Sequence, residues 1–210
     1  MDILIDDALV DSGFIDNQTV AQTLRHLQQN ICAPGQVVVA LRCDGEDVAA
    51  DHMTAALARS AANLDKLEVF TSTKERLVVD AMSQASAVLD KTEAACDAIA
   101  DLLTTGKTAQ GMQDLGECLR HWQQVHQAVG HAIQMLQIDV ENTTLAGRPL
   151  AEVVARPRDV LLQIKRALES ADHVLLADVM RYELGGVTDA WFSIIAMLRR
   201  RAEEHDDSSA

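Results

Sequence analysis

The spacing of hydrophobic residues changes near residue 73. Before it, short apolar runs separated by turn residues predict strands, and after it apolar residues recur at helical spacing to about residue 205. The clearest pattern consists of two rows with a seven-residue step, which are Leu115, Trp122, Val129 and Leu136, and Leu119, His126, Ile133 and Val140. A heptad repeat of this length predicts a long helix that packs nearly parallel to other helices.

Residues 1–73 predict a small α+β domain. Apolar residues on both sides of Asp6-Asp7 predict two short strands joined by a turn, and Thr19 or Asn17 is expected to cap a helix. The β-branched run from Val37 to Leu41 predicts a central strand with little exposed face.

The last predicted strand of this part is Leu67 to Thr71. The order of elements resembles the β-grasp fold of ubiquitin-like and sulfur-carrier proteins. Those proteins end in a free Gly-Gly tail, whereas here the last strand runs into a helix. The resemblance therefore implies a binding or structural module and no conjugation chemistry.

Residues 74–205 predict about four helices, over 74–103, 109–140, 150–168 and 172–203. Pro157 is expected to kink the third helix or to divide it. Gly185-Gly186 predicts a kink, a break or very close packing in the fourth. We therefore expect an α+β protein with a β-grasp-like domain (1–73), an antiparallel helical bundle (74–205) and a disordered tail (206–210).

Charge and composition narrow the possible functions. The chain has 32 acidic and 18 basic residues and a net charge of −14, so we expect no binding to nucleic acid or to an anionic membrane. The apolar runs are shorter than the roughly 18 residues of a membrane helix. The four cysteines lack zinc spacing, and the first residues are acidic, unlike a signal peptide. These features predict a soluble, cytoplasmic protein.

No residue pattern predicts catalysis, and we expect neither a metal nor a cofactor. Phosphate-loop, dinucleotide and nucleophile-elbow motifs are absent from the sequence, as is the Glu-x-x-His of ferritin-like sites. Glu93, Asp97 and Asp101 form a row one helical turn apart, which predicts a solvated face. We therefore expect that the protein is not an enzyme.

His126 is the polar member of the two heptad rows, and it allows three interpretations. A buried imidazole could be satisfied by a facing helix and fix the register. His126 could instead lie at an exposed edge of the seam. In the third interpretation, His126, Trp122, Tyr182 and Trp191 line an apolar ligand cavity between helices.

A C-terminal motif gives a second resemblance. Residues 172–184 read Asp-His-Val-Leu-Leu-Ala-Asp-Val-Met-Arg-Tyr-Glu-Leu, and a tryptophan-bearing helix follows. The chain resembles an uncharacterised bacterial family with this type of motif, in which a proline replaces Gly185-Gly186. The resemblance implies no activity and a link to motility. Asp178 and Tyr182 share a face one turn apart, which suggests a partner-binding surface.

The sequence thus predicts a non-catalytic intracellular adaptor or assembly protein that binds another protein. The heptad seam could also support a homodimer. A helical bundle that binds a small ligand near His126 is the alternative.

Overall fold

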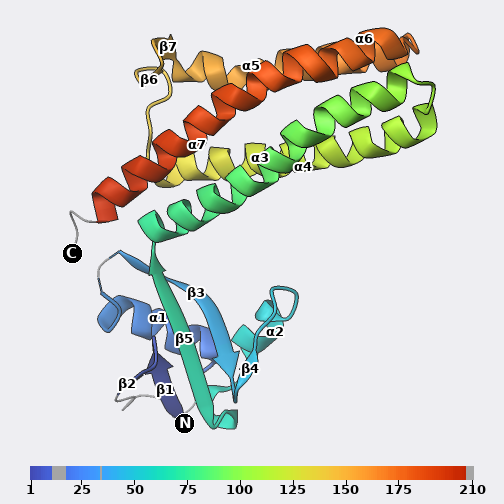
Figure 1. Ribbon diagram of the computed structural model, residues 1–210. Coiled ribbons are helices and arrows are strands. Elements are labelled where there is room, and N and C mark those ends of the chain that lie inside the picture. The colour runs from blue at the N-terminus through green and yellow to red at the C-terminus, as the bar shows by residue number, and fades with distance from the viewer. Residues whose placement is uncertain (11–17, 34, 207–210) are drawn as a thin grey trace. The chain divides into compact units, whose positions relative to one another are not determined.

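The computed structural model describes residues 1–10, 18–33 and 35–206. The chain divides into two units, Met1–Lys74 and Glu75–Ala210. The first is a mixed sheet with a helix and the second is helical, so the protein has an α+β fold with an N-terminal β-grasp-like domain followed by a helical region (Figure 1).

The N-terminal sheet has the strand order β2-β1-β5-β3-β4. Its strands are β1 (Asp2–Ile5), β2 (Ala8–Val10), β3 (Gln36–Cys43), β4 (Glu46–Asp47) and β5 (Lys66–Thr73). β1 and β5 are parallel, and the other neighbours are antiparallel. Asp6 and Asp7 join β1 to β2 with positive φ angles, and Asp44-Gly45 does the same between β3 and β4. Two-residue turns of this kind match the twist of a hairpin.

The expectation that Val37 to Leu41 is a central strand is wrong. β5 is the central strand, and β3 lies between β5 and the short β4, which pairs only with Arg42 and Cys43. A register shift between Val38 and Ala40 turns Val39 outward, where its side chain is exposed. The β-branched run therefore lies in a partly exposed stretch of β3 that pairs on one side only, with β5.

One helix covers one face of this sheet. α1 (Val20–Asn30) begins at a capping box, in which the Thr19 hydroxyl accepts from the Gln22 amide at 3.3 Å and the Gln22 side chain accepts from the Thr19 amide at 2.9 Å. Short segments α2 (Met53–Ala58) and η1 (Ala61–Asn63) follow β4. The buried core of the unit consists of Ile3, Val20, Leu24, Leu27, Leu41, Cys43, Leu64, Leu67 and Val69.

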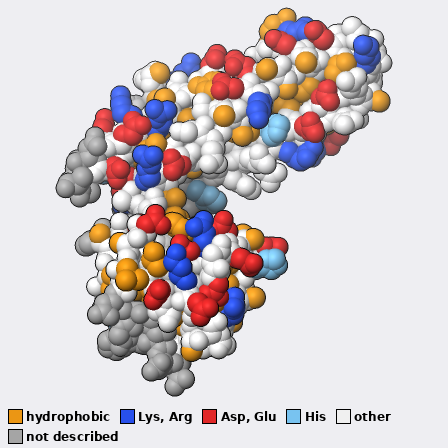
Figure 2. Space-filling view, turned by 60° about the horizontal axis from the view of Figure 1, so that its bottom comes forward, with side chains coloured by type: hydrophobic (Ala, Val, Ile, Leu, Met, Phe, Trp, Pro, Cys, Tyr) orange, Lys and Arg blue, Asp and Glu red, His pale blue; other side chains and the backbone are white. Residues whose placement is uncertain are grey.

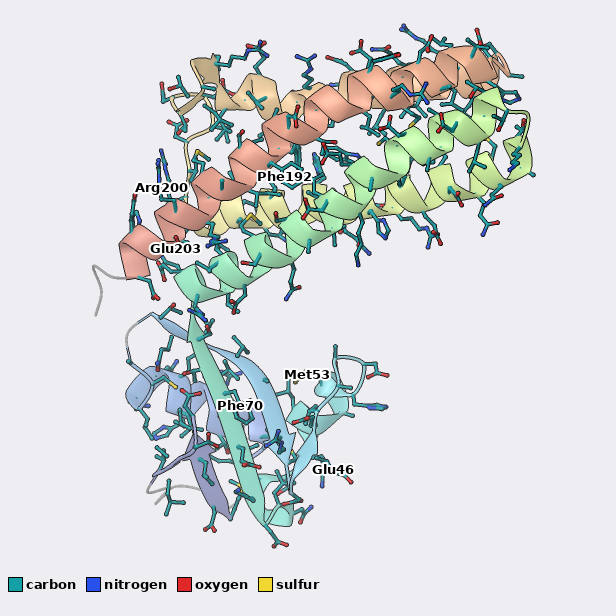
Figure 3. The ribbon with its side chains drawn as sticks, viewed as in Figure 1. Glu46, Met53, Phe70, Phe192, Arg200 and Glu203 are labelled. Atoms are coloured by element: carbon teal, nitrogen blue, oxygen red, sulfur yellow. The ribbon has the colours of Figure 1, made fainter. Side chains whose placement is uncertain are left out.

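The opposite face of the sheet carries a charged cluster. Glu68 on β5 is buried, and its carboxylate lies 3.0 Å from the Lys66 ammonium and 3.9 Å from the Arg42 guanidinium. The Arg42 guanidinium also lies over the ring of Phe70, 5.3 Å from its centroid. Figure 3 labels Phe70 on β5. The face of this unit seen in Figure 2 mixes acidic, basic and hydrophobic side chains.

The helical unit begins directly after β5. Its elements are α3 (Lys74–Thr104), α4 (Thr108–Met135), the small hairpin of β6 (Thr144–Leu145) and β7 (Arg148–Pro149), α5 (Leu150–Glu169), α6 (His173–Asp178), the π-helix η2 (Val179–Leu184) and α7 (Gly185–Asp206). These helices share one buried core. Asp206, the first residue of the expected tail, is the last residue of α7, and 207–210 lie outside the described residues.

The heptad of α4 is present, but its second row is displaced by one residue. The buried residues of α4 are Gly111, Leu115, Cys118, Trp122, Val125, Val129 and Ala132, which alternate steps of four and three. Leu119, Ile133 and Leu136 are only half-buried, and α4 ends at Met135, before Val140. One of the small residues, Gly111, lies where α4 approaches the end of α3. A Cβ on Gly111 would come within 3.1 Å of the Leu103 side chain.

On α3, helical spacing of the apolar residues would place Leu77 in the inward row, but Val78 is buried and Leu77 is half-buried. From Met82 to Leu103, the buried residues follow a regular helical stripe. α5 is one continuous helix of 20 residues that contains Pro157, so the proline does not divide it.

Gly185-Gly186 does not mark close packing, because a Cβ on either glycine would meet nothing within 4 Å. The irregularity is the π-helix η2, which ends at Leu184, immediately before the two glycines. A π-turn contains one extra residue. Helix then continues through α7, with Val187, Trp191, Ile194 and Leu198 buried as predicted.

Candidate functional site

Two hollows meet between α4 and α5, and together we call them the α4–α5 groove. The inner lobe has a volume of about 350 Å³ and is lined by Leu119, Trp122, Gln123, His126, Pro157, Leu161 and Leu184. The outer lobe, of about 650 Å³, is lined by His126, Val140, Glu141, Ala151, Val154, Ala155, Pro157, Arg158, Leu161, Leu162 and Lys165. His126, Pro157 and Leu161 therefore belong to both lobes.

The α5 wall exists because this helix carries more apolar residues than its buried face holds. The buried residues are Leu150, Val153, Pro157, Val160, Ile164 and Ala167. Leu161 and Leu162 are displaced by one position and are 47% and 43% exposed. Leu161 and Leu168 were expected in the inward stripe, and both are exposed instead.

His126 is an exposed residue on the α4 wall, so the interpretation as a buried, satisfied histidine is wrong. The one-residue displacement of the buried row explains this, because Val125 takes the inward position. The imidazole stacks on the ring of Trp191 from α7, with 5.4 Å between centroids and 24° between planes. His126 thus covers the tryptophan with one face and borders both lobes of the groove.

The two tryptophans of the chain meet at this site. Trp122 lines the inner lobe although only 5% of it is exposed, and Trp191 is fully buried. Their rings make an edge-to-face contact with 5.4 Å between centroids. Neither indole Nε1 has a hydrogen-bond partner among the described residues. Buried indole N–H groups usually find an acceptor, so both tryptophans carry a buried donor that is unsatisfied among the described residues.

Tyr182 does not belong to this cluster. It lies on η2, is 68% exposed and lines neither lobe of the groove. Asp178 and Val174 are exposed one and two turns earlier. Of the four residues predicted to line a cavity, the structure brings together Trp122, His126 and Trp191 and leaves Tyr182 on a separate surface with Asp178.

The rim of the outer lobe is predominantly basic. Arg158 and Lys165 lie about two turns apart on α5, and Glu141 is the single acid that lines the same lobe. The Lys165 ammonium is 3.7 Å from Glu169, whereas Arg158 has no ion pair among the described residues. In a chain with a net charge of −14, this rim favours an occupant with acidic side chains.

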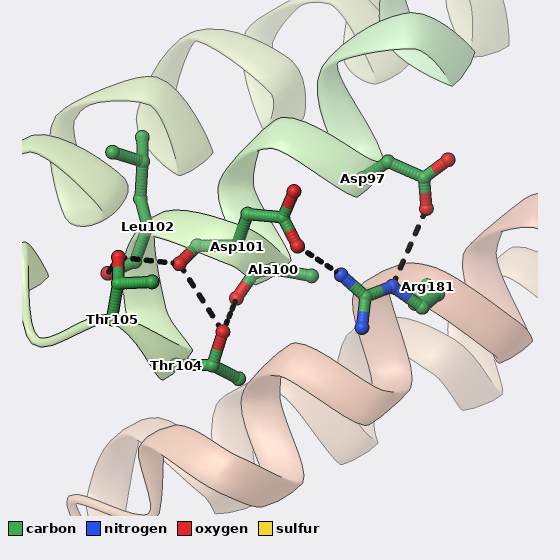
Figure 4. Close-up of polar contacts among 7 residues, drawn as sticks. All are labelled: Asp97, Ala100, Asp101, Leu102, Thr104, Thr105 and Arg181. Carbon is green, nitrogen blue, oxygen red and sulfur yellow. Dashed lines mark hydrogen bonds and ion pairs between the residues drawn. The ribbon is translucent and has the colours of Figure 1, made fainter.

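Figure 4 shows a polar contact that links α3 to the π-helix. The guanidinium of Arg181 pairs with Asp101 at 2.5 Å and with Asp97 at 3.5 Å. The row of acids predicted as a solvated face is therefore partly engaged. Partial burial lowers the pKa of Arg181, but the hydrogen bond and charge of Asp101 outweigh this and raise the pKa above its ordinary value.

We expect Arg181→Met to lower the thermal unfolding midpoint of the helical unit, because it leaves Asp97 and Asp101 one turn apart without a cation. Calorimetry at low and high salt checks this, and the loss should shrink as salt screens the carboxylates. An additional Asp101→Asn change should recover part of the midpoint. A loss that is the same at both salt concentrations would assign the effect to packing.

Cys96 and Cys118 are buried thiols that face each other from α3 and α4. Their hydrogen bond and burial raise the pKa of Cys96 above its ordinary value. The Cys96 thiol also donates to the Thr92 carbonyl at 3.2 Å. This thiol therefore stays protonated, and it packs in the core as the sequence predicts.

Within residues 1–10, 18–33 and 35–206, no group of three or more His, Cys, Asp or Glu residues could hold a metal ion. In the same ranges, every helix is too short or too polar to cross a bilayer.

The sequence did not identify Leu119, Gln123, Pro157, Leu161 and Leu184 as residues of the site. One signal was present in the sequence. Leu161-Leu162, next to buried Val160, gives α5 three consecutive apolar residues, which a single buried face does not accommodate.

Comparison with known families gives two matches. Residues 80–194 match the family described as Domain of unknown function (DUF8042). Residues 1–73 match the TP0873 N-terminal domain. No curated protein and no solved structure matches the chain.

Proposed function

Since the chain belongs to the DUF8042 family of unknown function, we propose its function from its own geometry: a non-catalytic adaptor or assembly protein that binds a helix of another protein in the α4–α5 groove. The observation that carries this proposal is the groove itself, whose α5 wall contains the partly exposed side chains of Leu161 and Leu162. Helix-in-groove recognition depends on such a surface.

The dimensions of the groove suit a helix. On α5, the lining residues Ala151 and Lys165 lie 14 residues apart, whereas on α4 the lining residues extend only from Leu119 to His126. At about 1.5 Å per residue, the α5 wall is roughly 20 Å long, which corresponds to three to four turns of a bound helix, and the α4 wall is roughly 10 Å long. The basic rim formed by Arg158 and Lys165 favours acidic residues on the edges of that helix.

Leu161→Glu tests the proposal. Leu161 lines both lobes and is half-exposed, so the change should leave the fold intact while placing a charge in the apolar wall. We expect at least about a tenfold loss of affinity for the partner. Leu175→Glu is the matched control, because Leu175 is 41% exposed on α6, outside the groove.

The measurement has two steps. Proteins retained from native cells by the wild type and by Leu175→Glu, but lost with Leu161→Glu, are groove partners. A helical segment of such a partner is then titrated while tryptophan fluorescence is followed, since the two tryptophans of the chain both lie at the groove. Equal retention by all three proteins would contradict the proposal.

A small-ligand-binding bundle is the second candidate. The apolar inner lobe, with Trp122 and His126 in its lining, favours it. Native mass spectrometry of the purified protein tests it, because a resident ligand would add a constant mass that Leu119→Phe reduces. A homodimer and a role in motility also stay predictions.

A further inference from the structure

We infer that the inner lobe is an anchor pocket for one aromatic side chain, phenylalanine or tyrosine, of the partner helix. The inference rests on the proposed function, because the groove must first bind a helix. It adds the chemistry by which the groove recognises its partner. The partner is thus an amphipathic helix with one aromatic residue on its apolar face and acidic residues on its edge.

The size of the inner lobe fits one side chain. Its volume of about 350 Å³ is near the lower end of the range for small-molecule pockets, about 300–1,000 Å³. A whole helix rests across both lobes, whereas one ring fills the inner lobe. Buried aromatic anchors of this kind provide most of the affinity at many interfaces.

The lining of the lobe favours a ring over an aliphatic side chain. Trp122 and His126 both contact Trp191, one edge-to-face and the other stacked, so the lobe borders an existing aromatic cluster. A further ring prefers offset or edge-to-face contacts with centroids about 4.5–7 Å apart. Pro157 and Leu161 supply the apolar wall on the α5 side.

The charges around the inner lobe agree with this occupant, since Arg158 and Lys165 lie on the outer lobe, where acidic residues flanking the anchor would pass. The Trp122 Nε1–H is buried and offers the anchor no hydrogen bond, so phenylalanine and tyrosine both suit the pocket.

The first test uses p-cresol, the side-chain analogue of tyrosine, and toluene, that of phenylalanine. The chain has two tryptophans, so its ¹⁵N–¹H spectrum contains two indole signals, which Trp→Phe variants assign. We expect both p-cresol and toluene to shift the Trp122 signal saturably. Leu119→Phe narrows the inner lobe and should abolish the shift, whereas Leu162→Phe, in the outer lobe, should keep it.

The second test uses two peptides of about 18 residues, or five helical turns, with leucines on one face and glutamates on its edges. They differ only in a central tyrosine or alanine. We expect the tyrosine peptide to bind at least tenfold more tightly, and Leu119→Phe to remove that difference. Equal binding of both peptides would overturn the inference of an aromatic anchor pocket, while the proposal that the groove binds a helix would stand. Saturable p-cresol binding without binding of either peptide would overturn the helix-binding function instead.

Discussion

Trp191→Ala is expected to lower the free energy of unfolding of the helical unit by about 3–5 kcal/mol. Trp191 is fully buried among α4, α5 and α7, and it contacts both Trp122 and His126. Its removal leaves a large cavity and takes away the surface on which His126 stacks. Urea unfolding followed by the fluorescence of the remaining Trp122 measures this loss.

Tyr182→Ala is the control for this prediction. Tyr182 belongs to the same chain of helices but is 68% exposed, so its truncation should change the free energy of unfolding by no more than about 0.5 kcal/mol. A loss below about 1 kcal/mol for Trp191→Ala would contradict the packing described for the groove floor. Such a result would also weaken the case for a preformed inner lobe.

Leu67→Ala is expected to unfold the N-terminal unit and to leave the helical unit folded. Leu67 is fully buried on the central strand β5, and truncation at such a site costs about 2–5 kcal/mol. A single core in a unit of this size supplies only about 3–5 kcal/mol. Limited proteolysis should therefore cut residues before Lys74 and spare those after it.

Tryptophan fluorescence separates the two units in this experiment, because Trp122 and Trp191 both lie in the helical unit. Their unfolding midpoint should stay at the wild-type value in Leu67→Ala. Val39→Ala, at the exposed bulge of β3, is the control and should leave proteolysis unchanged. A lower tryptophan midpoint in Leu67→Ala would show that the two units unfold together.

The sequence predicted the helices well because their apolar spacing is long and regular. The heptad of α4 is present over residues 111–132, and the inward residues of α7 were identified correctly. The second row of α4 lies one residue from the position that its large apolar residues indicate. The structure buries the small residues Gly111, Cys118 and Ala132 instead, and their small size carries little signal in a hydropathy pattern.

The same limit applies to the candidate site. Trp122, His126 and Trp191 could be grouped from helical spacing alone, since each lies on or beside an inward row. Tyr182 could not be excluded, because the extra residue of η2 changes the direction of side chains in a way that regular helical spacing does not show. The α5 wall of the groove depends on which of several leucines the core accepts, and only tertiary packing decides that.

The π-helix fixes the number of residues that separate α6 from α7. Successive residues of an α-helix are separated by about 100° around its axis, so one extra residue in η2 sets the rotational phase of α7 relative to α6. Leu176 on α6 and Trp191 on α7 are both buried, and both can face the core only with that rotational phase. The segment between Asp178 and Gly185 therefore needs a fixed length. Substitutions in it should be tolerated better than insertions or deletions.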